Sequence, residues 1–336
     1  MNNKVAIIGG GSWATALVKI VCDASPDTEI FWYIRHKKNI EHIRQTSRNK
    51  LYLSSLELDT NRIFMSDNID KIVAQADLLL LAVPSAFLES VLEKLTVDIS
   101  KKQVVSAIKG IIPNKNELIS QYMQSHYGVS LETYATLIGP SHAEEIGMER
   151  LTFLSVFSER KNFARQVATQ LQTPYLSFSI SEDVEGAEFA SSLKNIYALA
   201  VGIAAGLGYG DNFIAVLISS AIRETSHLLE TLVNTKKRNI CDTAYLGDLL
   251  VTAYSKFSRN RMFGFMIGKG YSVKYALMEM RMIPEGYYTT ESMAKICREK
   301  EVSMPIVSGV FHTLYGEHPA SEEFGKLRKQ LSSKIN

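Results

Sequence analysis

Hydrophobic residues in the first half of the chain fall into short continuous runs, and most runs are followed by a stretch with helical spacing. Runs that are apolar on successive residues are typical of strands covered on both faces. Alternation of such strands with helices predicts a doubly wound parallel sheet in an α/β domain. The expected strands are Val5–Ile8, Glu29–Ile34, Leu78–Val83, Val104–Ile108, Thr136–Ile138, Thr152–Phe157 and Pro174–Ile180.

The pattern changes after Ser181, where long stretches with helical periodicity replace the strand-like runs. We therefore expect an α/β domain over residues 1–181 and an all-α domain over residues 182–336. A cleft between two domains is the default position for a ligand site. The expected helices of the second domain are Glu185–Leu207, Asn212–Thr231, Thr243–Phe257, Met262–Lys269, Val273–Met280, Thr289–Glu299 and Pro305–Tyr315.

Composition narrows the class of protein. The length of 336 residues favours two domains, and 37 basic against 35 acidic residues leave a net charge of +2. This balance gives no reason to expect nucleic acid or stable membrane association. The apolar stretch Ile196–Leu207 is shorter than the roughly 20 residues that span a bilayer, so it predicts a buried helix.

The cysteines point to a reducing compartment. Cys22, Cys241 and Cys297 fit neither a disulfide framework nor the spacing of metal ligands. The first strand begins so early that it leaves no room for a signal peptide. We expect a cytoplasmic protein without a metal site.

A glycine-rich loop follows the first expected strand. Gly9, Gly11 and Ala14 occupy the three small-residue positions of a G-x-G-x-x-G/A loop that opens a helix. The first glycine permits a tight turn, the second lets the backbone approach a pyrophosphate, and the third position allows close helix–strand packing. The helix N-terminus then offers N–H groups to the phosphates. The loop predicts a Rossmann-type domain that binds a dinucleotide.

The end of the second strand bears on cofactor choice. An NAD-specific site usually places a carboxylate there for the ribose 2′-hydroxyl, but this strand runs into Arg35-His36-Lys37-Lys38. A basic end suits a 2′-phosphate, so NADP(H) is expected to be preferred and NAD(H) to be used as well. The alternative interpretation is a solvated run of charges.

Two segments of the second domain carry chemistry. Lys194 stands at the start of a very apolar helix, where a lysine needs a partner or a role. An ammonium in a water-poor site can donate the proton that a ketone needs after hydride addition, and a nearby cation lowers its pKa. The alternative is a lysine held in a structural salt bridge. Ser258-Arg259-Asn260-Arg261, a short distance after Asp248, has the hydroxyl, amide and guanidinium groups of a phosphate clamp.

With these features in place, the sequence resembles the NAD(P)-dependent glycerol-3-phosphate dehydrogenase family, bacterial type, over nearly its whole length. The resemblance implies reversible reduction of dihydroxyacetone phosphate to glycerol 3-phosphate, which supplies glycerophospholipid synthesis. Any one matching segment is modest support, but nine in the same order are highly specific. They are GGGSWATAL at 9–17, AVPS at 82–85, SAIKGI at 106–111, LIGPSHAEE at 137–145, SLKN at 192–195, GLGYGDN at 206–212, GDLLVT at 247–252, SRNRMFG at 258–264 and PEGYYT at 284–289.

The resemblance also implies roles for individual residues. The implied catalytic residues are Lys194 as proton donor and acceptor, with Lys109 and Asp248 beside it. The implied cofactor contacts are Gly9, Gly11, Ser12, Trp13, Arg35, Lys109, Ala143, Arg259, Ile283 and Glu285. The implied substrate contacts are Lys109, Gly139, Ser141, Lys194, Asp248, Ser258, Arg259 and Asn260.

Two positions depart from the family pattern. Ile214 stands where the family usually has a lysine, and Ser220 stands where it usually has an arginine. Arg223, one turn after Ser220, is placed to compensate on the same helix face. The departures affect expectations for helix packing or for contact between two copies, and a homodimer remains open.

Two other readings compete with this one. A β-hydroxyacid dehydrogenase or a ketopantoate reductase would also have a lysine, but with an anchor for a carboxylate. A nucleotide sensor without turnover would keep the glycine loop and lose the lysine and the anion clamp. Oligomeric state, feedback inhibition, the NADPH-to-NADH ratio and the direction of the reaction in the cell are not evident from the sequence.

Overall fold

The computed structural model describes residues 4–233, 238–280, 282, 284–316 and 318–333. The chain forms two compact units. Unit 1 comprises the described part of Met1–Ile108 together with Ile119–Val184, and unit 2 comprises Lys109–Leu118 with the described part of Glu185–Asn336. The expected division at residue 181 treats each domain as one continuous segment. The structure differs in that Lys109–Leu118 groups with the helical unit.

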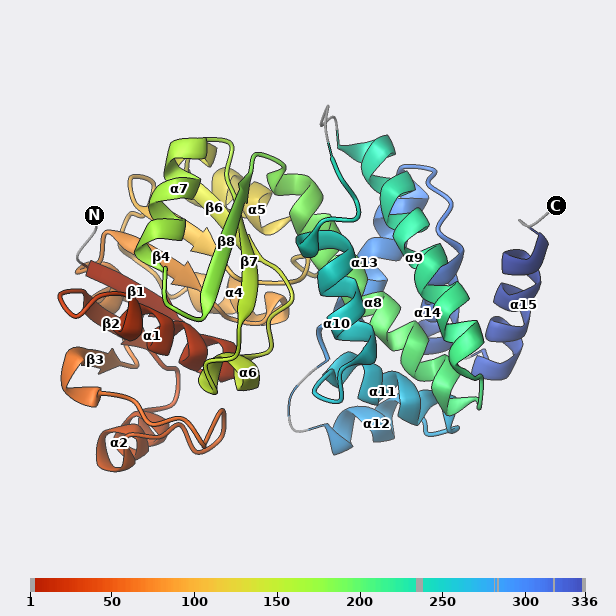
Figure 1. Cartoon of the computed structure of the whole chain (residues 1–336), viewed down its shortest axis with the longest axis horizontal. Helices are drawn as coiled ribbons and strands as arrows, with labels where there is room; N and C mark the ends of the chain where they lie inside the picture. The colour runs from red at the N-terminus through yellow and green to blue at the C-terminus, as the bar shows by residue number, and fades with distance from the viewer. Residues whose placement is uncertain (1–3, 234–237, 281, 283, 317, 334–336) are drawn as a thin grey trace. The chain divides into compact units, whose positions relative to one another are not determined.

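Unit 1 is built on an eight-stranded sheet with the order β3-β2-β1-β4-β5-β6-β7-β8. The strands are largely buried because helices such as α1 (Ser12–Ala24) and α7 (Lys161–Gln170) contact them, as Figure 1 shows. This is the expected doubly wound Rossmann-type arrangement. The strands are β1 (Lys4–Ile8), β2 (Glu29–Tyr33), β3 (Ile63–Ser66), β4 (Leu78–Leu81), β5 (Gln103–Ser106), β6 (Tyr134–Ile138), β7 (Thr152–Phe157) and β8 (Leu176–Ser181).

Two details of the sheet differ from the prediction. Strand β3 was not expected, since its apolar run, Ile63–Met65, is only three residues long; the strand lies at the sheet edge, where Phe64 is exposed. Strand β7 pairs antiparallel to β6, although a wholly parallel sheet was expected. The helix between them, α6 (Ala143–Gly147), has only five residues and packs on α1, so it does not provide the long crossover that parallel pairing requires.

The described part of unit 2 after Val184 is helical, as expected. One helix beyond those expected, α15, buries Phe324, Leu327 and Leu331. No helix among the described residues is long and apolar enough to cross a bilayer. The elements are α8 (Val184–Gly206), α9 (Asp211–Leu232), a π-helical turn η3 (Thr243–Gly247), α10 (Asp248–Tyr254), α11 (Arg259–Gly268), α12 (Val273–Glu279), α13 (Glu285–Glu299), α14 (Pro305–Tyr315) and α15 (Ala320–Ser333).

Helices α8 and α11 cross at backbone distance because four glycines meet there. A Cβ added at Gly202 or Gly206 of α8 would lie 2.2 Å from the Arg261 carbonyl oxygen or 2.4 Å from that of Phe265. A Cβ at Gly264 or Gly268 of α11 would lie 2.2 or 2.3 Å from a carbonyl oxygen of α8. A residue with a side chain cannot fit at any of these four positions unless the backbone shifts. This glycine crossing fixes α11 relative to the C-terminal part of α8.

Candidate active site

The glycine loop of unit 1 has the geometry expected of a phosphate cradle. Gly9 has a φ of +138°, and a Cβ there would lie 2.5 Å from the Ala82 carbonyl oxygen, so only glycine fits. A Cβ at Gly11 would meet nothing within 4 Å, which leaves open space beside the N-terminus of α1. Helix α1 begins at Ser12 without a side-chain cap. Its first N–H groups are therefore available to an anion.

Trp13 supplies an independent test of whether a cofactor fits. Its indole Nε1 is buried and has no hydrogen-bond partner among the described residues. A buried N–H without an acceptor is costly, and such groups are usually satisfied by water or a ligand. The neighbouring glycine cradle and this unmet donor both suit a dinucleotide at the start of α1. A nicotinamide cofactor bound there would supply hydride.

The end of β2 is basic in the structure as in the sequence. Arg35, His36, Lys37 and Lys38 are all exposed, and the Arg35 Nε lies 3.3 Å from His36 Nε2. Lys37 and Lys38 open helix α2 (Lys37–Thr46), whose first turn has no acidic residue. Cations at the positive end of a helix are unfavourable unless an anion is nearby. The arrangement suits a phosphate group better than a bare ribose hydroxyl.

The second loop of interest in unit 1 follows β6. Gly139 has a φ of +149°, and a Cβ there would lie 2.7 Å from the Phe153 carbonyl oxygen. The Ser141 hydroxyl donates to the Gly139 carbonyl at 3.0 Å and closes the turn. Ala143 is the buried first residue of α6. The loop is rigid, and its glycine is required by the turn itself.

Three charged residues of unit 2 form a compact group in which Lys194 and Asp248 are buried and Lys109 is partly exposed. The Lys194 ammonium donates to Asp248 Oδ1 at 2.5 Å, and the Lys109 ammonium lies 3.1 Å from Asp248 Oδ2. Lys194 also donates to the Thr252 hydroxyl at 3.0 Å, and that hydroxyl donates to the Asp248 backbone carbonyl at 2.6 Å. An ammonium has three N–H bonds, and these two acceptors account for two of them. The third is available to a substrate oxygen.

The electrostatics of this group favour proton transfer. Burial lowers the pKa of Lys194 from 10.5 to about 7; the Asp248 carboxylate opposes the shift, and the Lys109 charge adds to it. Two cations, the buried Lys194 and the partly exposed Lys109, share the Asp248 carboxylate. A group whose pKa lies near neutrality can both give and take a proton at physiological pH.

A chain of amide hydrogen bonds connects the three segments that carry the site. Asn195 donates to the Lys109 backbone carbonyl at 2.8 Å, and Asn260 donates to the Asn195 side-chain oxygen at 2.9 Å. The Gly286 N–H donates to the Asn260 side-chain oxygen at 2.9 Å. Sequence reasoning missed Asn195 and Thr252. Asn195 directly follows Lys194 in the sequence, and Thr252 lies one turn after Asp248 on α10. These positions are the signal that could have identified the two residues.

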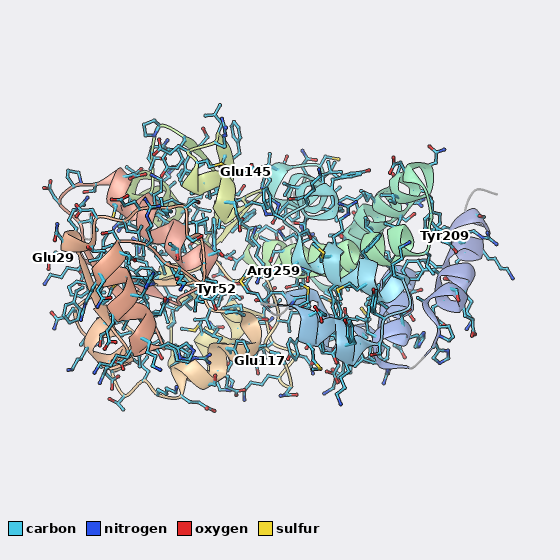
Figure 2. The ribbon with its side chains drawn as sticks, turned by 90° about the horizontal axis from the view of Figure 1, so that it is seen from below. Glu29, Tyr52, Glu117, Glu145, Tyr209 and Arg259 are labelled. Carbon is cyan, nitrogen blue, oxygen red and sulfur yellow. The ribbon has the colours of Figure 1, made fainter. Side chains whose placement is uncertain are left out.

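Three residues of the predicted phosphate clamp, Ser258, Arg259 and Asn260, lie in different environments. Ser258 is buried and caps α11 by accepting the Arg261 N–H at 3.3 Å. Asn260 is buried in the amide chain and has one N–H left. Arg259, the first residue of α11 and labelled in Figure 2, is exposed, and no described residue pairs with its guanidinium. Arg259 is therefore the member of the clamp that is free to bind an anion.

The remaining predicted positions are placed as follows. Asp248 begins α10 directly after the π-helical turn η3, a local irregularity that is frequent at functional sites. Glu285 is the first residue of α13, next to the Gly286 N–H that joins the amide chain. Ile283 lies outside the described residues.

The two departures from the family pattern are accommodated within α9. Ile214 and Ser220 are both buried. Arg223 donates to the Ser220 hydroxyl at 3.1 Å, so it contacts the position that it was expected to compensate. Both departures lie on a helix that contributes no residue to the charged group.

One group of residues in the described part of the chain has metal-ligand character. Atoms of His318, Glu322 and Glu323 lie within 4.8 Å of one another beside a cavity of about 670 Å³ between α13, α14 and α15. The Lys326 ammonium lies 2.8 Å from both carboxylates. A lysine in this position already neutralises the acidic pair, so the arrangement is explained without a metal.

Comparison with known proteins places this geometry in context. Residues 4–164 match the family model described as NAD-dependent glycerol-3-phosphate dehydrogenase N-terminus, and residues 183–324 match the model of its C-terminus. The glycerol-3-phosphate dehydrogenase (NAD(P)+) of Syntrophomonas wolfei is 33% identical over 99% of this chain and 96% of its own length. The chain belongs to the NAD-dependent glycerol-3-phosphate dehydrogenase family.

Other relatives of the dehydrogenase agree. The glycerol-3-phosphate dehydrogenase (NAD(P)+) of Staphylococcus carnosus is 31% identical over 95% of this chain and 96% of its own length. A solved glycerol-3-phosphate dehydrogenase from Coxiella burnetii is similar in fold, with a TM-score of 0.88 and 24% identity over 96% of this chain and 98% of that one. A D-mandelate dehydrogenase has a TM-score of only 0.59 at 12% identity over 94% of this chain and 98% of that one.

Proposed function

We propose that this dehydrogenase reduces dihydroxyacetone phosphate to glycerol 3-phosphate, reversibly, with a nicotinamide cofactor. The observation that carries the proposal is the Lys194–Asp248–Lys109 group, because it combines a proton donor of suitable pKa with a second cation beside it. Membership of the family and the free guanidinium of Arg259 point to a phosphate-bearing substrate. A binding module without turnover would not need a buried lysine at this pKa.

In the proposed reaction the ketone oxygen accepts the third N–H of Lys194. As hydride reaches the carbonyl carbon, negative charge develops on that oxygen, and Lys194 transfers its proton to it. Asp248 keeps the ammonium in position through its Oδ1, and the Thr252 hydroxyl fixes the second N–H. In the reverse direction the neutral Lys194 takes the proton from the alcohol.

Arg259 is the proposed anchor for the substrate phosphate. A guanidinium binds phosphate oxygens in a planar, bidentate manner that a lysine cannot match. The remaining N–H of Asn260 is proposed to donate one hydrogen bond to the phosphate. The Ser258 hydroxyl already caps α11, so it is proposed to add at most one more. Lys109 is proposed to contact both substrate and cofactor, with Gly139 and Ser141 bordering the substrate and Ala143 bordering the cofactor.

NADP(H) is the proposed preferred cofactor, and NAD(H) is proposed as a weaker alternative. The cradle of Gly9, Gly11 and Ser12 would receive the diphosphate, and Trp13 would donate its unmet N–H near the nicotinamide end. Arg35 would pair with the 2′-phosphate. Glu285 and Ile283 are proposed as further cofactor contacts. A cytoplasmic location and a homodimer remain part of the proposal.

The proposed function is tested with the same enzyme and two substrates, dihydroxyacetone phosphate and uncharged dihydroxyacetone, by following oxidation of NADPH. The wild type should turn over the phosphorylated ketone and act poorly on the other. Arg259→Ala should raise KM for dihydroxyacetone phosphate at least tenfold, because a charge-assisted bond contributes about 1.5–3 kcal/mol. It should barely change the activity on dihydroxyacetone.

Arg298→Ala is the matched control, since it removes an exposed arginine of unit 2 from the end of α13. This control should leave both substrates unaffected. Equal losses on both substrates in Arg259→Ala would assign the arginine to the cofactor or to the fold. Preference of the wild type for a 2-keto or 3-keto acid over both ketones would replace the proposed function with that of a hydroxyacid dehydrogenase.

A further inference from the structure

Exposed apolar side chains are concentrated in one part of unit 2. Among the described residues, fourteen large hydrophobic side chains are exposed, and eight of them lie between residues 250 and 278. Monomeric soluble proteins rarely gather such residues without a use for them. None of the eight belongs to the charged group of the active site or to the amide chain. The catalytic proposal therefore does not account for them.

Five of the eight lie on two neighbouring helices and the turn between them, and we call these five the α11–α12 face. Met262 and Phe265 lie three residues apart on α11, and Tyr275 and Met278 lie three apart on α12, with Tyr271 in the turn between. The Tyr271 and Tyr275 rings stack at 5.3 Å. Helices α11 and α12 contact each other and lie side by side in Figure 1. Each of the five side chains is at least 41% exposed, and Met278 reaches 76%.

Lysines accompany this apolar face. The Lys269 ammonium lies 5.4 Å from the centre of the Phe265 ring, and Lys274 is exposed beside Tyr275 on α12. The face thus carries two lysines, and the acidic residue next to it is Glu279 at the end of α12. Exposed Tyr, Phe and Met mixed with Lys are the composition of surfaces that lie in the interface of an anionic bilayer.

Charge decides between the two occupants that an apolar face can have. A symmetric contact with a second copy would bring the same patch of each copy together and so place Lys269 and Lys274 of one copy close to the same two lysines of the other. Like charges brought together at an interface are unfavourable. An anionic lipid surface complements the same cations and accepts the aromatic rings.

We propose that the α11–α12 face docks the enzyme reversibly on anionic membrane surfaces. The contact is peripheral: the helices are short, so the rings enter only the headgroup region and the lysines remain at the phosphate level. The attraction depends on ionic strength because the lysines are exposed. This inference is independent of the substrate proposed above, since no residue of the face belongs to the active site.

The test is co-sedimentation of the full chain with vesicles of phosphatidylcholine alone or of equal parts phosphatidylcholine and phosphatidylglycerol. The wild type should bind only the anionic vesicles, and salt should release it. Lys269→Glu/Lys274→Glu should reduce the partition coefficient at least about 25-fold, because each lysine near an anionic surface contributes roughly fivefold. Phe265→Ser/Tyr271→Ser/Tyr275→Ser should reduce it at least about tenfold through loss of apolar burial.

Matched controls exist for both variants. Lys295→Glu/Lys300→Glu reverses two exposed lysines of the same unit, and Leu151→Ser/Phe153→Ser removes two exposed apolar residues of unit 1. Both controls should bind like the wild type, and every variant should keep its turnover in the absence of vesicles. Failure of the wild type to bind anionic vesicles, or equal binding by the lysine variant, would overturn the proposal. So would a light-scattering change from dimer to monomer in either face variant, because the face would then be a subunit interface.

Discussion

Lys194 illustrates how a single residue acquires its chemistry from its neighbours. Its ammonium is buried, and its two identified acceptors, Asp248 and Thr252, both lie on α10. Lys194→Ala should reduce kcat by about 10²–10⁴-fold, the range typical of an acid–base group. Affinity for NADPH should change little, because Lys194 does not belong to the glycine cradle. Lys295→Ala, on the exposed surface of α13, is the control. Turnover within a few-fold of the wild type would assign Lys194 to a structural salt bridge.

The pH dependence of the reaction follows from the same residue. Burial lowers the pKa of Lys194 to about 7, so the fraction of protonated Lys194 falls as the pH rises through that value. Reduction needs the protonated form, and its kcat should therefore decline above about pH 7. Oxidation needs the neutral form and should rise over the same interval. Profiles of kcat in both directions measure this. Parallel profiles in the two directions would contradict the assignment.

The expected preference for NADPH over NADH rests on Arg35. It is exposed at the end of β2, and the residues that directly follow this strand include no carboxylate to repel a 2′-phosphate. Arg35→Ala should weaken NADPH by roughly tenfold and leave NADH almost unchanged, since an exposed charged pair is partly screened. Dissociation constants from fluorescence titration at two salt concentrations provide the measurement, and Lys50→Ala is a control in the same unit. A variant that is neutral toward both cofactors would mean that the basic run is only solvated.

At the scale of elements, the glycine crossing of α8 and α11 positions the active site. A Cβ at Gly264 would lie 2.2 Å from the Leu199 carbonyl oxygen, so Gly264→Ala should force the two helices apart. Overpacking of this kind costs about 1–3 kcal/mol, against a gain in helix propensity of about 1 kcal/mol. The variant should have a lower Tm. It should also have a higher KM for dihydroxyacetone phosphate, because Arg259 and Asn260 are the first two residues of the displaced helix.

Gly309→Ala is the control for this effect. Gly309 is also within a helix, but a Cβ there meets nothing within 4 Å. Its substitution should leave Tm unchanged or raise it slightly, and should leave KM unchanged. Thermal unfolding and steady-state kinetics on the two variants measure the difference. Equal Tm values for Gly264→Ala and the wild type would show that the crossing relaxes easily.

The elements also show what periodicity can and cannot predict. Strand-like patterns identified seven of the eight strands, and β3 was missed because its apolar run of three residues is short. Helix α15 does have periodic apolar residues and was within reach of the same reasoning. The site was predictable where one residue carries the chemistry, as with Lys194. Asn195 and Thr252 were not, because their roles arise only when α8, α10 and α11 come together.

At the scale of the whole molecule, the two units do not correspond to two continuous halves of the chain. Lys109–Leu118 belongs to the helical unit, although the chain on both sides of it belongs to unit 1. The Lys109 ammonium contacts Asp248, and its backbone carbonyl accepts from Asn195. The ten residues therefore complete the charged group of a unit whose other residues begin only at Glu185.

This interruption has a consequence for how the enzyme can be divided and assembled. A fragment that starts at Glu185 would keep Lys194 and Asp248 but lack one of the two cations that neutralise the buried carboxylate. The charged group of the helical unit is incomplete until Lys109–Leu118 packs into that unit. During synthesis Lys109–Leu118 leaves the ribosome before the helices that carry Lys194 and Asp248. An exchange of the continuous segment before Glu185 between relatives would also transfer Lys109, so such hybrids would take one member of the charged group from the segment that carries the glycine loop.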